Sequence, residues 1–295
     1  MTPMSRVAQE QALVGLYQLV ADRFAPEGFL RWDNPGVEDD LPSVELRRDA
    51  GNRRREAFSV AGGDMTSHTE IAVNLWVSFP EVESVFDKWW YAVGHRKAPW
   101  PPPAPTVTAS LAGSMELAGQ ELGQVLSQFK IFAPSDVRRV SAVVNDGITQ
   151  FGLPFFAAFP TLRALDREID WRTPFRRQIG ASIPCPHIRM LIVARLLARP
   201  DYPEVLDRYT REIRDDKTAH WRDFQMLLPI LADVQPVAEA YRPGEPPSPP
   251  PRRHRREPLL RWMWKRWVRY RAGQKLRRSI VPYSTYEREI KRREL

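Results

Sequence analysis

The sequence predicts an α+β fold, in which an opening helix is followed by an antiparallel meander and then by a mainly helical region. Residues 7–20 place apolar side chains at helical spacing, residues 71–77 alternate apolar with polar side chains, and the helical spacing returns after residue 135. Hydrophobic residues make up 43% of the 295 residues and charged residues 27%, so the chain can bury a core and is not wholly disordered.

The first 98 residues carry the helix and the meander. Ser5 precedes a helix whose broad apolar face comprises Val7, Leu13, Val14, Leu16, Tyr17 and Val20. Strands are expected at 29–32, 44–48, 56–60 and 71–77, separated by turns at 34–36, 51–52 and 62–64. In the last strand one face is expected to be buried (Ile71, Val73, Leu75, Val77) and the other partly exposed (Ala72, Asn74, Trp76, Ser78). Pro80 then stands where the first turn of a helix accepts proline.

The region after residue 105 is predicted to be mainly helical and packed on the sheet. Returning strands are expected at 106–111 and 129–132. Ser135 and Asp136 begin a helix with an apolar stripe, which Gly152, Leu153 and Pro154 are expected to end. Further helices are predicted over the ranges 161–170, 187–199, 203–214 and 221–231.

Two proline clusters, at 99–105 and 242–251, mark the expected boundaries, because neither can continue a helix or a central strand. The predicted organisation has five parts: a helix plus sheet (1–98), a Pro-rich segment (99–105), a mainly helical part (106–241), a Pro/Arg-rich linker (242–257) and a helical tail (258–295). The second cluster also contains the P-x-x-P pattern of ligands for aromatic grooves, although a plain spacer has the same composition.

Residues 5–170 resemble an uncharacterised bacterial α+β domain family of unknown function. The resemblance depends on the order helix, meander and short strand, followed by Ser135-Asp136-Val137, Leu153-Pro154-Phe155-Phe156 and Thr161-Leu162 with Leu165. It implies the α+β fold and says nothing about chemistry, because the family carries no established catalytic residues that could be mapped onto this chain. Residues 186–241 and the tail lie outside it.

No segment specifies a reaction, and we expect no catalytic residue, no cofactor and no metal site. The phosphate-binding loop, dinucleotide-binding, zinc-protease and nucleophile-elbow motifs are all absent. His68, Glu70, Cys185 and His187 only faintly match the zinc-deaminase pattern, which requires a second cysteine. Asp216, His220 and Asp223 could share a helix face but are too few for a metal site, and Cys185 beside His187 is more often a packing residue than a reactive thiol. An enzyme would require a pocket that gathers titratable residues which the sequence scatters, such as His68, Glu70, His187 and His220.

Composition also constrains location. No apolar stretch reaches the roughly 18–20 residues that cross a bilayer, and Glu10 and Asp22 interrupt the N-terminal segment where a signal peptide needs an apolar run. A single cysteine cannot form an intramolecular disulfide, so we expect a cytoplasmic protein.

Charge is concentrated at the C-terminus. Residues 251–295 contain 16 Lys and Arg against 4 Asp and Glu, so the tail carries +12 and residues 1–250 carry −4. Within the tail, Pro258 begins a predicted helix whose apolar side chains fall within about 140° of arc: Leu259, Leu260, Met263, Trp264, Trp267 and Tyr270. The opposite arc carries Arg261, Lys265, Arg266 and Arg269, with Trp262 among them.

Such a basic amphipathic helix has three interpretations. The apolar arc can dock in a groove of a protein, it can lie on an anionic membrane, or the cations of residues 252–280 can bind nucleic-acid phosphates while the tryptophans stack on unpaired bases. A tail that only aids solubility is the simplest alternative. We expect a non-catalytic interaction or assembly protein that docks on a protein partner. The alternatives are a nucleic-acid-associated protein with a phosphate-binding arm and a peripheral membrane protein.

Overall fold

A computed structural model describes residues 5–32, 43–51, 54–65, 68–95, 105–117, 120–168, 186–215 and 220–247. The chain begins with α1 (Arg6–Phe24), which Ser5 caps by accepting a hydrogen bond from the N–H of Ala8, as predicted. Val7 and Val14, however, are 63% and 64% exposed, so their predicted place in the buried face is wrong. At about 100° per residue they lie roughly 140° and 120° from Val20, outside the buried arc.

The predicted antiparallel meander is confirmed. A 3-10 turn (Ala25–Glu27) leads into β1 (Leu30–Trp32), β2 (Ser43–Asp49), β3 (Arg55–Met65) and β4 (His68–Ser78). Two later strands, β5 (Val107–Ser110) and β6 (Lys130–Ile131), both pair antiparallel with β4, which also confirms the predicted returning strands. The sheet order is therefore β1-β2-β3-β4-β5, with β6 beside the first residues of β4.

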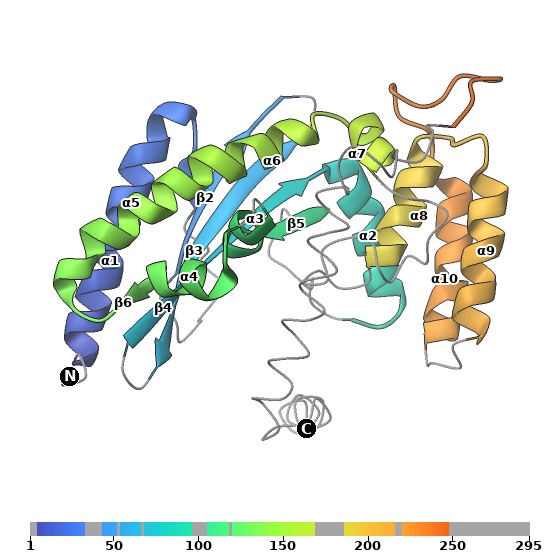
Figure 1. Ribbon diagram of the computed structural model, residues 1–295. Helices are drawn as coiled ribbons and strands as arrows, with labels where there is room; N and C mark the ends of the chain where they lie inside the picture. Colours follow the sequence, from blue (N-terminus) through green and yellow to red (C-terminus); the bar gives the residue numbers. More distant parts are fainter. Residues whose placement is uncertain are drawn as a thin grey trace.

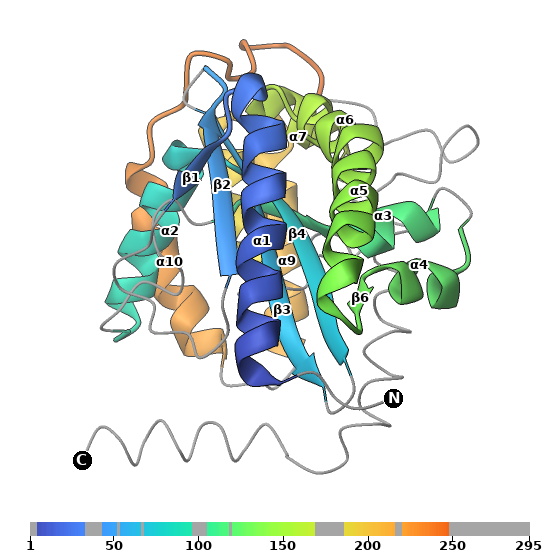
Figure 2. The ribbon, with the colours of Figure 1, turned by 90° about the vertical axis from the view of Figure 1, so that its left-hand side faces the viewer.

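One face of this sheet is buried and the other is partly open. Ile71, Val73, Leu75 and Val77 are each at most 4% exposed, whereas Ala72 and Asn74 are exposed and Trp76 is half-buried. Ser78 departs from the expectation because it is fully buried at the end of β4. Figure 2 shows α1 and α5 (Val137–Gly147) side by side across the covered face.

The expected turn at 62–64 is wrong, because these residues lie inside β3, which stays paired with β4 as far as Met65 and His68. Gly62 explains the difference. A Cβ atom at this position would lie 2.5 Å from a methyl group of Leu13, and the N–H of Gly62 donates to the hydroxyl of Tyr17. The glycine thus allows α1 to approach the strand closely and does not mark a turn.

The helix that begins after Asp136 does not stop where expected. A short 3-10 turn (Pro134–Asp136) leads into α5, and a π-helical segment (Ile148–Gly152) then continues into α6 (Leu153–Ala158). The wider π turn accommodates Pro154, which would clash in a regular helix. Gly152 passes within 3.3 Å of a Leu75 methyl group, measured from the position its Cβ would take, so it brings helix and sheet together.

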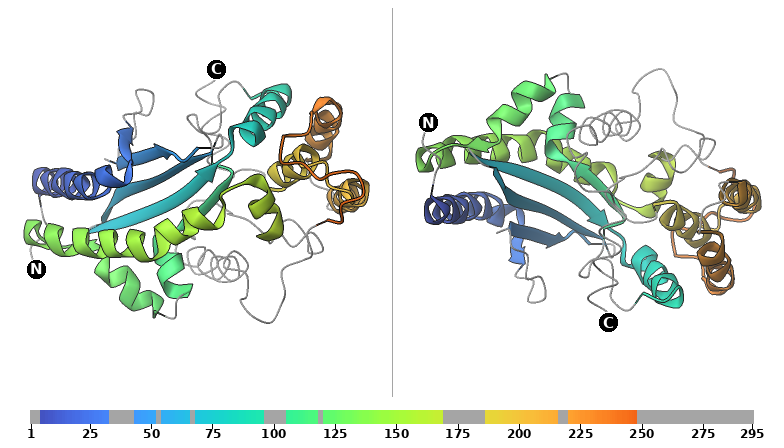
Figure 3. Two further views of the ribbon diagram at one scale, coloured as in Figure 1. Left: turned by 90° about the horizontal axis from the view of Figure 1, so that it is seen from above. Right: turned by 90° about the horizontal axis from the view of Figure 1, so that it is seen from below.

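The remaining helices complete the fold. Two short helices, α3 (Leu111–Leu117) and α4 (Leu122–Gln128), link β5 to β6. Beyond the end of β4, α2 (Pro80–Ala92) packs against α8 (Pro186–Leu196) and α10 (His220–Asp233), with α9 (Tyr202–Asp215) beside them and α7 (Leu162–Glu168) above, as Figure 1 shows. Seen from above and below in Figure 3, this helical group extends the sheet along its length and does not cover it.

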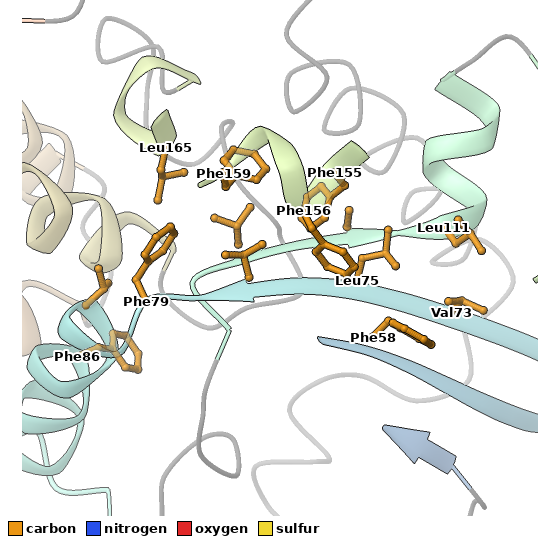
Figure 4. Packing of buried hydrophobic residues seen from close by; sticks show 14 of the residues in the cluster. Phe58, Val73, Leu75, Phe79, Phe86, Leu111, Phe155, Phe156, Phe159 and Leu165 are labelled. Atoms are coloured by element: carbon orange, nitrogen blue, oxygen red, sulfur yellow. The ribbon is translucent and has the colours of Figure 1, made fainter. Parts of the chain in front are cut away.

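One hydrophobic cluster of the described residues joins the sheet to the helical group beyond the end of β4. Six phenylalanines of β3, α2, α6 and the caps of these helices are at most 2% exposed and belong to this cluster, and Figure 4 labels them: Phe58, Phe79, Phe86, Phe155, Phe156 and Phe159. Among the described residues, no helix is long and apolar enough to cross a membrane.

Candidate interaction groove

The tail residues singled out from the sequence lie outside the described residues. The apolar set is Leu259, Leu260, Met263, Trp264, Trp267 and Tyr270, and the cationic set is Arg261, Lys265, Arg266 and Arg269. Cys185 and Asp216 lie outside them as well. Their roles remain predictions from the sequence.

The fold places the titratable residues singled out from the sequence on elements at opposite ends of β4. His68 and Glu70 stand at the start of β4, which has 11 residues and is therefore about 33 Å long. His187 and His220 belong to the first turns of α8 and α10, which pack on α2 beyond the opposite end of that strand. Among the described residues no group of three metal-ligating side chains occurs.

A groove of about 1020 Å³ lies between α2, the end of α10 and the segment that follows it. On the α2 side it is lined by Glu81, Ser84, Val85 and Lys88. These four positions follow one another at helical spacing and so form a single face of α2. The apolar lining comes from Val85, Leu196, Ile230, Val234 and Val237.

The opposite wall of the groove is held in place by hydrogen bonds. The N–H of Val237 donates to the carbonyl of Leu196 at 2.9 Å. Arg195 donates from Nε to the carbonyl of Leu231 at 2.9 Å and from Nη2 to that of Ala232 at 3.2 Å, which satisfies carbonyl groups at the end of α10. Hydrogen bonds within the protein therefore fix this wall before any ligand binds.

The groove is acidic. Three of its lining residues carry carboxylates (Glu81, Asp233, Glu239) and one, Lys88, carries a cation. Asp233 is exposed at the C-terminal end of α10, where the helix dipole also favours positive charge. The carboxylate of Glu239 accepts the N–H groups of Leu162 and Arg163 at 3.0 and 3.3 Å, so it also caps α7.

A latch next to the groove fixes the segment that leads to the tail. Arg163 donates two hydrogen bonds to the carboxylate of Glu245, at 2.8 and 2.9 Å, and two more to the carbonyls of Glu239 and Ala240. Its guanidinium lies 3.6 Å from the ring centre of Tyr241. The body therefore holds the chain through Glu245, four residues beyond the predicted boundary at Tyr241.

The latch is expected to persist in moderate acid. The Arg163 guanidinium, together with the N–H of Arg242, lowers the pKa of Glu245 from 4.5 to about 2. The folded protein thus favours the carboxylate, and the stabilisation it contributes is complete above about pH 4.5 and lost as the pH falls towards 2. Amide hydrogen exchange of residues 237–245, corrected for its intrinsic pH dependence, should stay constant from pH 7 to 5.

Glu245→Gln should weaken the hydrogen bonds between Arg163 and residue 245, because the side chain loses its charge. Amide exchange of residues 237–245 should therefore be faster than in the wild type at pH 7. Glu204→Gln, at an exposed acidic residue in the first turn of α9, is the matched control and should leave exchange there unchanged. Equal exchange in the wild type and Glu245→Gln would contradict the latch.

Two buried charge clusters hold the helices around the groove, and sequence reasoning found neither. Arg189 of α8 is fully buried and donates to both carboxylate oxygens of Glu83, which also accepts a hydrogen bond from Thr106. Burial raises the pKa of Glu83 despite the neighbouring guanidinium. In the second cluster, the fully buried Asp166 accepts hydrogen bonds from Arg199 and from the hydroxyl of Tyr241.

The sequence held one signal for the first cluster. Residues 188–197 are apolar on every side of the helix except at Arg189 and Arg195, and a helix that is apolar all round is buried. A buried arginine requires an acidic partner, but nothing in the linear sequence selects Glu83 from the other carboxylates.

No protein-family model matches this chain, and neither the curated proteins nor the solved structures contain a significant match. The resemblance of residues 5–170 to an uncharacterised bacterial family therefore remains a prediction.

Proposed function

We propose that the protein is a non-catalytic interaction or assembly protein whose C-terminal helix, residues 258–270, docks on a protein partner in the cytoplasm. The observation that carries the proposal is the division of that helix into an arc of six apolar side chains, two of them tryptophans, and an arc of four cations. Tryptophan and arginine dominate the binding energy of protein interfaces, and an amphipathic helix in a groove is a common recognition mode.

The body supports this proposal through its own chemistry. Its described residues offer a preformed acidic groove but no cluster of metal-ligating groups. The segment that leads towards the tail contains Glu239 and Glu245. The nearby cation Arg163 donates two hydrogen bonds to the Glu245 carboxylate. A phosphate-binding arm would gain from a basic surface continuous with the tail, whereas the described groove lining carries three carboxylates and one lysine.

The proposal is tested by capture of binding partners from lysate with three variants of the full chain. Trp264→Ala/Trp267→Ala removes the centre of the apolar arc and should reduce capture of a protein partner at least about tenfold, the loss expected when interface anchors are truncated. Trp262→Ala is the matched control, because Trp262 lies among the cations. Arg261→Glu/Arg266→Glu/Arg269→Glu removes the phosphate-binding capacity.

Each competing function predicts a different result. Nucleic acid that is lost in high salt and with the arginine variant, but retained by the tryptophan variant, would replace the proposal with a phosphate-binding arm. Recovery of lipid in place of protein would indicate a membrane role. Full-length variants are required because a chain cut at Tyr241 would lose Glu245 and with it the latch.

A further inference from the structure

We propose that the groove between α2 and the segment 230–239 is the resting site of the chain's own C-terminal helix, residues 258–270. This inference rests on the proposed function, since it concerns the same helix, and it adds the regulation of that helix. In the absence of a partner the apolar arc lies in the groove, and a partner binds by displacing it.

The shapes of the two surfaces match. Helix-in-groove recognition uses anchors at positions i, i+3, i+4 and i+7. In the tail these positions are Leu260, Met263, Trp264 and Trp267. The groove offers a preformed hollow of about 1020 Å³, the upper end of the size of typical binding pockets, with an apolar lining from α2, α8 and α10.

The charges of the two surfaces also match. The groove lining carries Glu81, Asp233 and Glu239 against Lys88, so its net charge is negative. The arc of the tail helix that faces away from its apolar anchors carries four cations. With the anchors in the groove, Arg261 and Arg266, which flank the apolar arc, come close to the acidic rim, while Lys265 and Arg269 face solvent. This charge arrangement favours the pairing and its orientation.

The linker is long enough for the helix to reach the groove within one chain. The described chain ends at Pro247, eight residues after Glu239 of the groove, so the two lie at most about 28 Å apart whatever path connects them. Pro258 follows Pro247 by eleven residue steps, which span up to about 34 Å even in a polyproline helix. Docking in the same chain is favoured over docking in a second copy because a short linker gives a millimolar effective concentration.

Docking has an expected consequence for partner binding. A 13-residue helix is only marginally stable in water without a surface to pack on. Binding in the groove would therefore stabilise the helix and at the same time block its access to a partner. Variants that weaken the groove should therefore increase partner capture. The contact between the groove and residues 258–270 is therefore autoinhibitory.

Amide hydrogen exchange of the full-length protein tests the inference. Residues 258–270 should exchange at least about tenfold more slowly than an unstructured chain, and equally slowly after tenfold dilution of the protein. Ser84→Arg/Asp233→Lys adds bulk and positive charge at two exposed groove positions and should abolish this protection. Asp146→Lys, at an exposed position of α5, is the matched control and should not.

The outcomes separate the two proposals. Unprotected tail amides in the wild type, or protection that survives the groove variant, would overturn the resting site while leaving tryptophan-dependent partner capture intact. Protection that falls on dilution would overturn docking within one chain and assign the groove to a second copy. Absence of a protein partner with tail protection present would instead overturn the proposed function.

Discussion

Arg189→Met is expected to lower the free energy of unfolding by about 3–5 kcal/mol, the cost of leaving a buried charge without its partner. Glu83 is 5% exposed, and in the wild type its carboxylate accepts three hydrogen bonds from the guanidinium, at 2.7–3.1 Å. The variant also loses the contact between the guanidinium and the Phe86 ring, 3.6 Å from its centre. Urea unfolding of the full chain measures the change.

The double variant Glu83→Gln/Arg189→Met should recover most of this loss, because replacing both members of a buried ion pair is often close to neutral. Arg211→Met is the control for the loss of an arginine. Its ion pair with Asp207 is about two-thirds exposed, so we expect a change of about 1 kcal/mol or less. A loss no greater for Arg189→Met than for Arg211→Met would contradict the buried pair.

Asp166→Asn is expected to lower the free energy of unfolding by about 2–4 kcal/mol. The Asp166 carboxylate is fully buried and accepts hydrogen bonds from the guanidinium of Arg199 and from the hydroxyl of Tyr241. An amide of the same size keeps one acceptor oxygen but turns N–H groups towards one of these donors. Urea unfolding gives the stability, and exchange at 237–245 should rise because Tyr241 belongs to the latch.

Asp201→Asn is a control within the same cluster. Asp201 binds the same guanidinium, but its side chain is 35% exposed, so water can replace the lost charge and we expect a change of about 1 kcal/mol or less. Equal effects of the two substitutions would show that Asp166 is not the buried anchor described here.

The sequence predicted the elements of the fold where local physical chemistry decides them. Ser5 caps the first helix, Pro80 begins α2 and the alternation in 71–77 gives the correct buried face, because each depends on neighbours within one turn or one strand. Gly62 and Pro154 misled the prediction for the opposite reason. Their roles depend on Leu13 and on a π turn, which are contacts and backbone geometry that a local pattern does not contain.

The groove and its charge clusters could not be predicted, because their members are distant in sequence. Glu83 and Arg189 are 106 residues apart, and Arg163 and Glu245 are 82 apart. The fold alone brings Glu81, Asp233 and Glu239 to one hollow. The apolar and cationic arcs of the tail, in contrast, are formed by residues close in sequence, so they can be predicted from the sequence alone.

The central claim is that the apolar arc of the C-terminal helix contacts protein. A photoreactive aromatic residue placed at position 267 of the full chain tests it most directly, with the same residue at position 262 as control. We predict crosslinks from position 267 to the groove residues of the same chain in the purified protein and to a protein partner in lysate, with few from position 262. Crosslinks from position 267 to lipid or nucleic acid, or equal crosslinking from both positions, would contradict the account.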